Sequence, residues 1–174
     1  RAVGKIGEAV GGAASYVGGV LVSTANAGNL DWTTTAKEEI KRNEGKRLVA
    51  YKDAKGYSIG FGHFGVSPGT KITDQQADQL FEEDFAAKEL LARKAIPSFD
   101  SLSNELKIQV LQGFYRGDLS GSPKTLALIN EGKYTEASRE FLNNDEFLDP
   151  STPRSIKNRM LLIANALELE SSTS

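Results

Sequence analysis

The stretch from Asn43 to His63 constrains the fold of this chain more than any other part of the sequence. It begins where an apolar spacing over residues 36–44 predicts a helix that ends at Glu44. Gly45 follows directly, and glycine is a typical helix stop because it tolerates the left-handed backbone that a helix end often needs. We therefore expect the Glu44 side chain to stand at the exposed end of a helix.

Two short strands are predicted after this helix, because residues 47–51 and 57–61 are rich in aromatic and β-branched side chains. Asp-Ala-Lys-Gly, which begins at Asp53, separates them and is a turn signal. The predicted hairpin would place Asp53 opposite Glu44, across a gap that the hairpin sets.

Two carboxylates held apart in a cleft are what glycoside hydrolysis requires. One must be protonated to give its proton to the leaving oxygen, and the other must be ionised to activate water or to attack the sugar. Glu44 and Asp53 can take these two roles. The pair alone is a weak signal, because two surface acids with no chemical role would give the same pattern.

The whole stretch resembles the phage-type lysozymes, glycoside hydrolase family 24. That family has a helix ending in Glu-Gly, followed by L-x-x-Y-x-D-x-x-G-x-x-T-I-G-x-G-H. With one gap allowed, the matching residues are Glu44, Gly45, Leu48, Tyr51, Asp53, Gly56, Ile59, Gly60, Gly62 and His63. The sequence departs from the family at the hydroxyl, which is Ser58 in place of Thr and follows a turn one residue shorter.

The resemblance implies roles for eight residues. Glu44 would be the general acid, Asp53 would orient the attacking water, and Ser58 would hold that water through its hydroxyl. His63 would tie the small lobe together through a hydrogen bond or ion pair, and Arg154 would pair with Glu44 across the cleft. The positions that match the sugar-binding cleft of the family are Phe64, Phe114 and Thr125, for which core packing or an ordinary helix position is the alternative.

The rest of the chain reads as helices. Apolar spacing predicts a long helix from Thr73 to just before Pro97, with an acidic face that we expect to be solvated. Thr73 with Gln76, and Thr35 with Glu38 before the first helix, match capping boxes. Further helices are expected to begin near residues 103, 123, 135 and 152, and residues 168–174 read as a frayed polar tail.

Strands near the front, followed by segregated helices, predict an α+β fold. The resemblance, which covers about residues 33–168, implies a lysozyme-like fold with a small β-sheet lobe and a helical lobe joined by a long helix. We therefore expect residues 31–174 to form a lysozyme-like catalytic domain.

Residues 1–30 differ in composition from the rest, because the run from Ala9 to Leu30 carries no charge and is rich in Gly and Ala. Three interpretations stay open: a linker or docking segment, a weak membrane segment, and a signal peptide with Ala25-Asn26-Ala27 as its cleavage site. The first residue is Arg, so we expect a chain processed or cut from a longer one.

Composition excludes several classes of function. The net charge of -2 gives no basic field for nucleic acid, and no cysteine is present for thiol chemistry. The single histidine argues against a zinc site, so we expect no metal, and the resemblance implies no cofactor.

The resemblance implies a muramidase that cleaves the β-1,4 bond between N-acetylmuramic acid and N-acetylglucosamine in bacterial peptidoglycan. It would be phage-encoded and act at the host cell wall in the periplasm, as a released endolysin or as a virion-associated lysin. Attachment to a virion or a membrane through residues 1–30 fits either case. The alternatives are a non-catalytic wall-binding or virion structural module and a lytic transglycosylase, which needs a Glu but no water-activating Asp.

Overall fold

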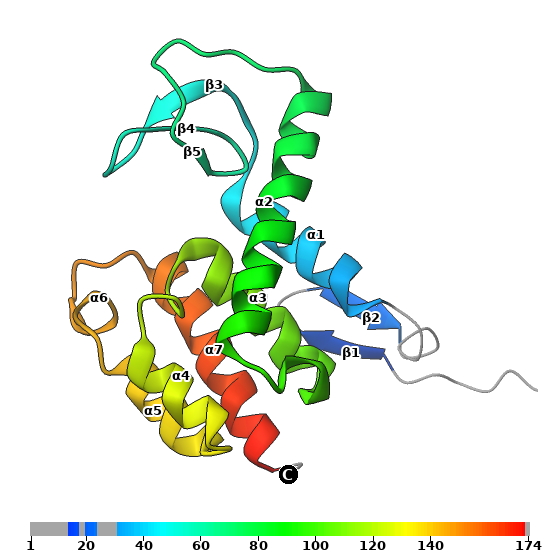
Figure 1. Ribbon diagram of the computed structural model, residues 1–174, viewed down its shortest axis with the longest axis vertical. Helices are drawn as coiled ribbons and strands as arrows, with labels where there is room; N and C mark the ends of the chain where they lie inside the picture. Colours follow the sequence, from blue (N-terminus) through cyan, green and yellow to red (C-terminus); the bar gives the residue numbers. More distant parts are fainter. Residues whose placement is uncertain (1–13, 18–19, 24–30, 173–174) are drawn as a thin grey trace, which may run out of the picture. The chain divides into compact units, whose positions relative to one another are not determined.

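The computed structural model describes residues 14–17, 20–23 and 31–172, and divides the chain into two compact units, Arg1–Asp31 and Trp32–Ser174 (Figure 1). In the first unit, β1 (Ala14–Val17) and β2 (Val20–Ser23) pair as an antiparallel hairpin. The three interpretations of residues 1–30 concern residues that lie largely outside the described ones. Among the described residues, no helix has the length and hydropathy needed to cross a membrane.

The second unit begins with α1 (Trp32–Glu44), which buries Ala36 and Ile40. The helix starts at Trp32, so Thr35 lies inside it and the predicted capping box at Thr35 is wrong. Trp32 explains the earlier start, because its ring packs edge-on against Phe99 with 5.6 Å between the centroids. This contact extends the helix beyond the stretch that local periodicity marks.

A three-stranded antiparallel sheet follows, in the order β3 (Arg47–Lys52), β4 (Tyr57–Gly60) and β5 (His63–Phe64). The first two strands form the predicted hairpin. The third strand was not predicted, because two residues are too few to show any alternation of apolar and polar side chains. Gly60 and Gly62 both have positive φ angles, of 64° and 87°, and they form the tight return from β4 to β5.

The long helix α2 (Asp74–Ala95) connects this sheet to the remaining helices (Figure 1). Its predicted capping box is confirmed, since the Thr73 hydroxyl accepts from the Gln76 backbone N–H and the Gln76 side chain accepts from the Thr73 backbone N–H. Phe81 in the middle of α2 packs on Phe61, Phe85 and Tyr115, with centroids 5.4 to 6.0 Å apart. Because Phe61 belongs to the small lobe and Tyr115 to the helical lobe, this aromatic cluster fixes the two lobes to the connecting helix.

The helical lobe contains α3 (Asn104–Arg116), α4 (Pro123–Asn130), α5 (Tyr134–Leu142), α6 (Asp145–Leu148) and α7 (Arg154–Ser171). The central helix is α3, which contacts α1, α2 and α7 and buries side chains on most of its sides. Ser103 caps its start and Gly117, at φ 98°, ends it. The expected α+β fold with a small sheet and a helical lobe is thereby confirmed.

The end of the chain differs from the prediction. Residues 168–174 read as a frayed tail, but α7 continues to Ser171 and Glu170 is buried. The Glu170 carboxylate accepts a hydrogen bond from the Ser103 backbone N–H at 3.1 Å, so the last turn of α7 is held against the start of α3. A long-range contact therefore orders a segment whose local composition is polar.

Candidate active site

Glu44 is the last residue of α1, and Gly45 ends the helix with a φ of 69°. Gly62, in the turn between β4 and β5, lies beside the Glu44 carboxylate. A Cβ atom added at Gly62 would lie 3.4 Å from Glu44 Oε2, and the φ of 87° at Gly62 disfavours any larger residue. The positive φ, rather than a clash with Glu44, is therefore what favours glycine at position 62.

The Glu44 carboxylate is bound by Arg159, not by Arg154. Arg159 Nη2 donates to Glu44 Oε1 at 2.5 Å, and both side chains are about one-fifth exposed or less. Arg154, the first residue of α7, is exposed, so the predicted pair between Arg154 and Glu44 is wrong. The physical reason is helical spacing: Arg159 lies three residues after Ile156 on the side of α7 that faces the protein, whereas Arg154 precedes that stripe.

Asp53 lies in the turn between β3 and β4, and both of its carboxylate oxygens accept hydrogen bonds. Oδ1 accepts from the backbone N–H groups of Lys55 at 2.9 Å and Gly56 at 3.0 Å, and Oδ2 accepts from the Ser58 hydroxyl. The Ser58 hydrogen bond is the main cause that holds the pKa of Asp53 below its ordinary value, and the two backbone donors add to it. Asp53 is therefore held ionised and in one orientation.

Ser58 lies in β4 opposite Tyr51 of β3, and only 3% of its surface is exposed. Because the Ser58 hydroxyl donates its hydrogen bond to Asp53, the lone pairs of its oxygen can accept a further hydrogen bond. The shorter turn in this sequence therefore still brings the hydroxyl to the carboxylate. A water held between Ser58 and Asp53 would have an acceptor on each side.

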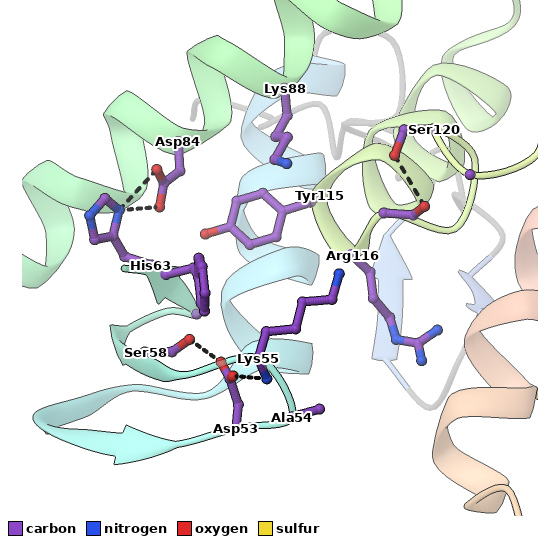
Figure 2. Close-up of a pocket in the computed structure, with 14 residues that line it drawn as sticks. Asp53, Ala54, Lys55, Ser58, His63, Asp84, Lys88, Tyr115, Arg116 and Ser120 are labelled. Atoms are coloured by element: carbon purple, nitrogen blue, oxygen red, sulfur yellow. Dashed lines mark hydrogen bonds and ion pairs between the residues drawn. The ribbon is translucent and has the colours of Figure 1, made fainter. Parts of the chain in front are cut away.

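A cavity of about 940 Å³ adjoins Asp53 and Ser58 (Figure 2). Its other walls come from β5, from α2 and from the end of α3 with the turn after it, so both lobes contribute. The lining residues used below are Lys55, Phe64, Asp84, Lys88, Tyr115 and Arg116. A volume of this size suits a ligand of several sugar rings.

The three expected sugar-binding residues separate into two groups. Phe64 lines the cavity and is 54% exposed, so its ring is available to a sugar face. Phe114 and Thr125 are 2% and 1% exposed and do not line the cavity, so the expectation that they contact sugar is wrong. Phe114 points into the core from α3, and Thr125 is enclosed in the first turns of α4.

His63 and Tyr115 join the small lobe to the helices at the cavity wall. His63 Nδ1 lies 3.0 Å from Asp84 Oδ2, which links β5 to α2. The Tyr115 hydroxyl donates to the Phe61 carbonyl at 2.8 Å. Burial is the main cause that raises the pKa of Tyr115 far above its ordinary value, with the charges of Asp84 and Glu44 adding to it, so this phenol stays protonated.

Sequence reasoning missed Arg159, Tyr115, Lys88 and Asp84. A signal existed for Arg159, because it continues the apolar spacing of its helix and must face inward. Tyr115 was visible as an amphipathic ring in the Phe-Tyr-Arg-Gly string. For Asp84 and Lys88, only the tertiary structure shows that this face of α2 turns toward the cavity.

Chemically, the site offers one carboxylate on a helix end, held by a guanidinium, and one ionised carboxylate on a hairpin, held by three donors. Asp53 lines the cavity, whereas Glu44 is not among its lining residues and lies beside Gly62, which does line it. Within the described part of the chain, no three His, Cys, Asp or Glu side chains gather in a way that could hold a metal ion.

The sequence of this chain is similar to those of several known proteins. The family model described as phage lysozyme matches residues 41–147, which is more than half of the chain. An endolysin of Bacillus phage PZA is 32% identical over 117 residues, covering 59% of this chain and 42% of the endolysin. The peptidoglycan hydrolase gp36 of Pseudomonas phage phiKMV is 44% identical over 52 residues, covering 28% of this chain and 6% of that protein.

This chain therefore spans less than half the length of these two relatives. Among solved structures, the muramidase domain of SpmX from Asticaccaulis excentricus is similar with a TM-score of 0.63 and 20% identity. The similarity covers 80% of this chain and 98% of that domain, and at this identity it supports the fold. The family match includes Glu44, Asp53 and Ser58, and the chain therefore belongs to the phage lysozyme family, a family of glycoside hydrolases.

Proposed function

We propose that this chain is a peptidoglycan hydrolase, a muramidase that cleaves the β-1,4 bond between N-acetylmuramic acid and N-acetylglucosamine. The observation that carries the proposal is the ionised carboxylate of Asp53 in the wall of a cavity, with the helix-end carboxylate of Glu44 beside Gly62 of the same wall. Asp53 is kept ionised by Ser58 and two backbone donors, and Glu44 ends α1. The relatives, an endolysin and a peptidoglycan hydrolase, support the same substrate class.

In this mechanism Glu44 is the general acid that protonates the leaving glycosidic oxygen. Its carboxyl group must be protonated at that moment, whereas the contact with Arg159 suits a carboxylate. Substrate binding must therefore loosen the pair between Arg159 and Glu44 before the proton is transferred. Until then, Arg159 keeps the Glu44 side chain in one position.

Asp53 is the general base, and the attacking water would be held between its carboxylate and the Ser58 oxygen. Direct attack by water inverts the anomeric carbon, and it requires room between the two carboxyl groups. We therefore expect the carboxyl groups of Glu44 and Asp53 to stand about 6.5–9.5 Å apart in the complex, in place of the roughly 5–5.5 Å of retaining enzymes.

The place of action follows from the substrate. The phage relatives support a phage-encoded enzyme that acts on the host cell wall in the periplasm. The enzyme would reach the wall either by release from the host cytoplasm, as an endolysin, or as part of the infecting virion. Residues 1–30, which precede the catalytic unit of residues 31–174, would serve for attachment.

The proposal is tested with Glu44→Gln, which preserves the shape of the side chain and removes its proton-donor chemistry. Loss of turbidity of a peptidoglycan suspension should slow by about 10²–10⁴-fold, the usual contribution of a positioned proton donor. The matched control is Glu38→Gln, an exposed Glu on the same helix, which should retain the parental rate. A Glu44→Gln variant within a few-fold of the parent would rule out Glu44 as the acid.

The same assay with soluble fragments distinguishes inversion from its alternatives. NMR of fresh product should show the α-anomer from the β-linked substrate. An initial β-anomer would mean retention, and would make Asp53 a nucleophile. An anhydro end would identify a lytic transglycosylase.

A further inference from the structure

The return from β4 to β5 has little rigidity of its own. Gly60 and Gly62 flank Phe61 in this return and have φ angles of 64° and 87°, in the region that favours glycine. Glycine loses more conformational freedom on folding than any other residue, so contacts from outside the sheet must fix the return in one position. The Phe61 side chain provides one such contact, because it is buried and its ring packs edge-on against Phe81 of α2 at 5.4 Å.

A second contact comes from Tyr115 in the last turn of α3. Its hydroxyl donates to the Phe61 carbonyl at 2.8 Å, across 54 positions of sequence. Its ring packs on Phe81 with the centroids 5.7 Å apart, so Phe81 supports both the donor and the acceptor of this hydrogen bond. In Figure 2 the Tyr115 ring lies between Arg116 and His63, with its hydroxyl turned toward His63. The phenol therefore reaches from the helical lobe to the middle of the return.

The two carboxylates that we assign to the reaction belong to different parts of the fold. Glu44 ends α1, and α1 packs against α3, the helix that carries Tyr115. Asp53 is held by Ser58 of β4, the strand that leads into the return. The hydrogen bond from Tyr115 to the Phe61 carbonyl therefore connects the helices that hold the acid to the sheet that holds the base.

The chemistry of the anchor suits this position. The phenol stays protonated because burial, followed by the charges of Asp84 and Glu44, raises the pKa of Tyr115. It is therefore a donor without a charge. A lysine or arginine could also hold the Phe61 carbonyl, but its positive charge would favour the ionised form of the nearby Glu44, which the acid role opposes.

We propose that Tyr115 is a positioning residue of the hydrolytic site, which fixes Asp53 and Ser58 relative to Glu44 by holding the Phe61 carbonyl. The inference rests on the proposed function, and it adds a residue that acts through the return rather than on the sugar. Direct attack by water requires a defined spacing of acid and base, and a displacement of about 1 Å can cost about 10²-fold in rate. Loss of the hydroxyl should therefore slow the chemical step more than it weakens substrate binding.

The test is Tyr115→Phe in the full chain, which removes the hydroxyl and keeps the ring on Phe81. On soluble wall fragments kcat should fall by about tenfold to hundredfold, while KM stays within about twofold of the parent. The Tm should fall by about 2–4 °C, as expected for one hydrogen bond. The matched control is Tyr134→Phe at the start of α5, which removes a hydroxyl from another partly buried tyrosine that does not line the cavity. It should leave kcat and KM unchanged.

NMR reports on the contact itself. The Gly62 nitrogen belongs to the same peptide group as the Phe61 carbonyl, so its resonance responds to the hydrogen bond that this carbonyl accepts. The Gly62 amide resonance should move in Tyr115→Phe and stay in place in Tyr134→Phe.

Three outcomes would overturn the inference. One is a Tyr115→Phe variant that loses thermal stability but keeps the kcat and KM of an active parent, because the hydroxyl would then be merely structural and the proposed function would stand. Another is a raised KM with unchanged kcat, which would make Tyr115 a substrate-binding residue. The third is a Gly62 resonance that does not move. A parent chain that fails to hydrolyse the fragments would instead contradict the proposed function, and the inference with it.

Discussion

Asp53 owes its charge state to one neighbour more than to any other. The hydrogen bond from the Ser58 hydroxyl is the largest cause of its lowered pKa, ahead of the backbone N–H groups of Lys55 and Gly56. Ser58, which we propose holds the attacking water, therefore also keeps Asp53 ionised. The hairpin register, with Ser58 opposite Tyr51, brings this hydroxyl, only 3% exposed, to the Asp53 carboxylate.

Asp53→Asn and Ser58→Ala should therefore differ in severity and in pH dependence. Asp53→Asn removes the base and should lower kcat/KM by about 10²–10⁴-fold at all pH values. Ser58→Ala removes one hydrogen bond and should lower kcat/KM by only about threefold to tenfold near neutral pH. Because the pKa of Asp53 rises when this donor is lost, the acid limb of its activity profile should move to higher pH.

The measurement is the pH profile of kcat/KM on soluble wall fragments, from acid to neutral pH. Ser155→Ala, at an exposed position near the start of α7, is the matched control and should leave the profile unchanged. An acid limb that stays in place in Ser58→Ala would show that Ser58 does not control the ionisation of Asp53.

At the scale of elements, α1 and the residues directly after it are joined to α2 by a row of charge pairs. Lys37, Lys41 and Lys46 pair with Glu82, Asp78 and Asp74 at 2.5, 3.0 and 2.9 Å. The same ammonium groups lie over core aromatic rings, as Lys41 does over Phe81 at 4.7 Å from the centroid. The acidic face of α2 is solvated as expected, because Asp78 and Glu82 stay about half exposed while they pair with the lysines of α1.

The packing of α3 gives a test of the helical lobe. Gly113 lies in the middle of α3, where a Cβ atom would come within 2.7 Å of the Leu119 side chain and 3.2 Å of Ile163 Cδ1. Alanine is a better helix former than glycine by about 1 kcal/mol, but forcing atoms into a packed core typically costs about 1–3 kcal/mol. Gly113→Ala should therefore lower the free energy of unfolding by up to about 2 kcal/mol, measured by urea denaturation.

A double-mutant cycle isolates the cause. Leu119→Ala alone should destabilise by about 2–5 kcal/mol, because Leu119 is fully buried. In that background the methyl group introduced at position 113 would have space, so adding Gly113→Ala should be neutral or stabilising. If Gly113→Ala destabilises equally in both backgrounds, the close approach of Leu119 is not the reason for glycine at this position.

At the scale of the whole molecule, the proposed catalytic residues and every lining residue of the cavity belong to the unit Trp32–Ser174. A chain that starts at residue 31 should therefore hydrolyse soluble wall fragments within about twofold of the full chain in kcat/KM. The two chains should also show the same cooperative urea unfolding of the helical lobe. Loss of activity on soluble fragments after this truncation would mean that residues 1–30 complete the catalytic unit.

The sequence alone determined the elements whose signals are local. The helix end at Gly45, the hairpin around Asp53 and the capping box at Thr73 each depend on residues within a few positions of one another. The family resemblance rested on the same short stretch, and the order of strands and helices was enough for the α+β class. Local backbone preferences and apolar spacing are fixed by neighbouring side chains, so they can be read without a fold.

The tertiary structure decided which distant residues meet. Arg159 reaches Glu44 across 115 positions of sequence, and the rotation of α7 selects it over Arg154. Phe114 and Thr125 lie in the interior of the helical lobe, whereas Lys88, one of many charges along α2, faces the cavity. These outcomes depend on how packed helices are turned about their axes, and that rotation is set by the burial of the whole core rather than by the residues on either side.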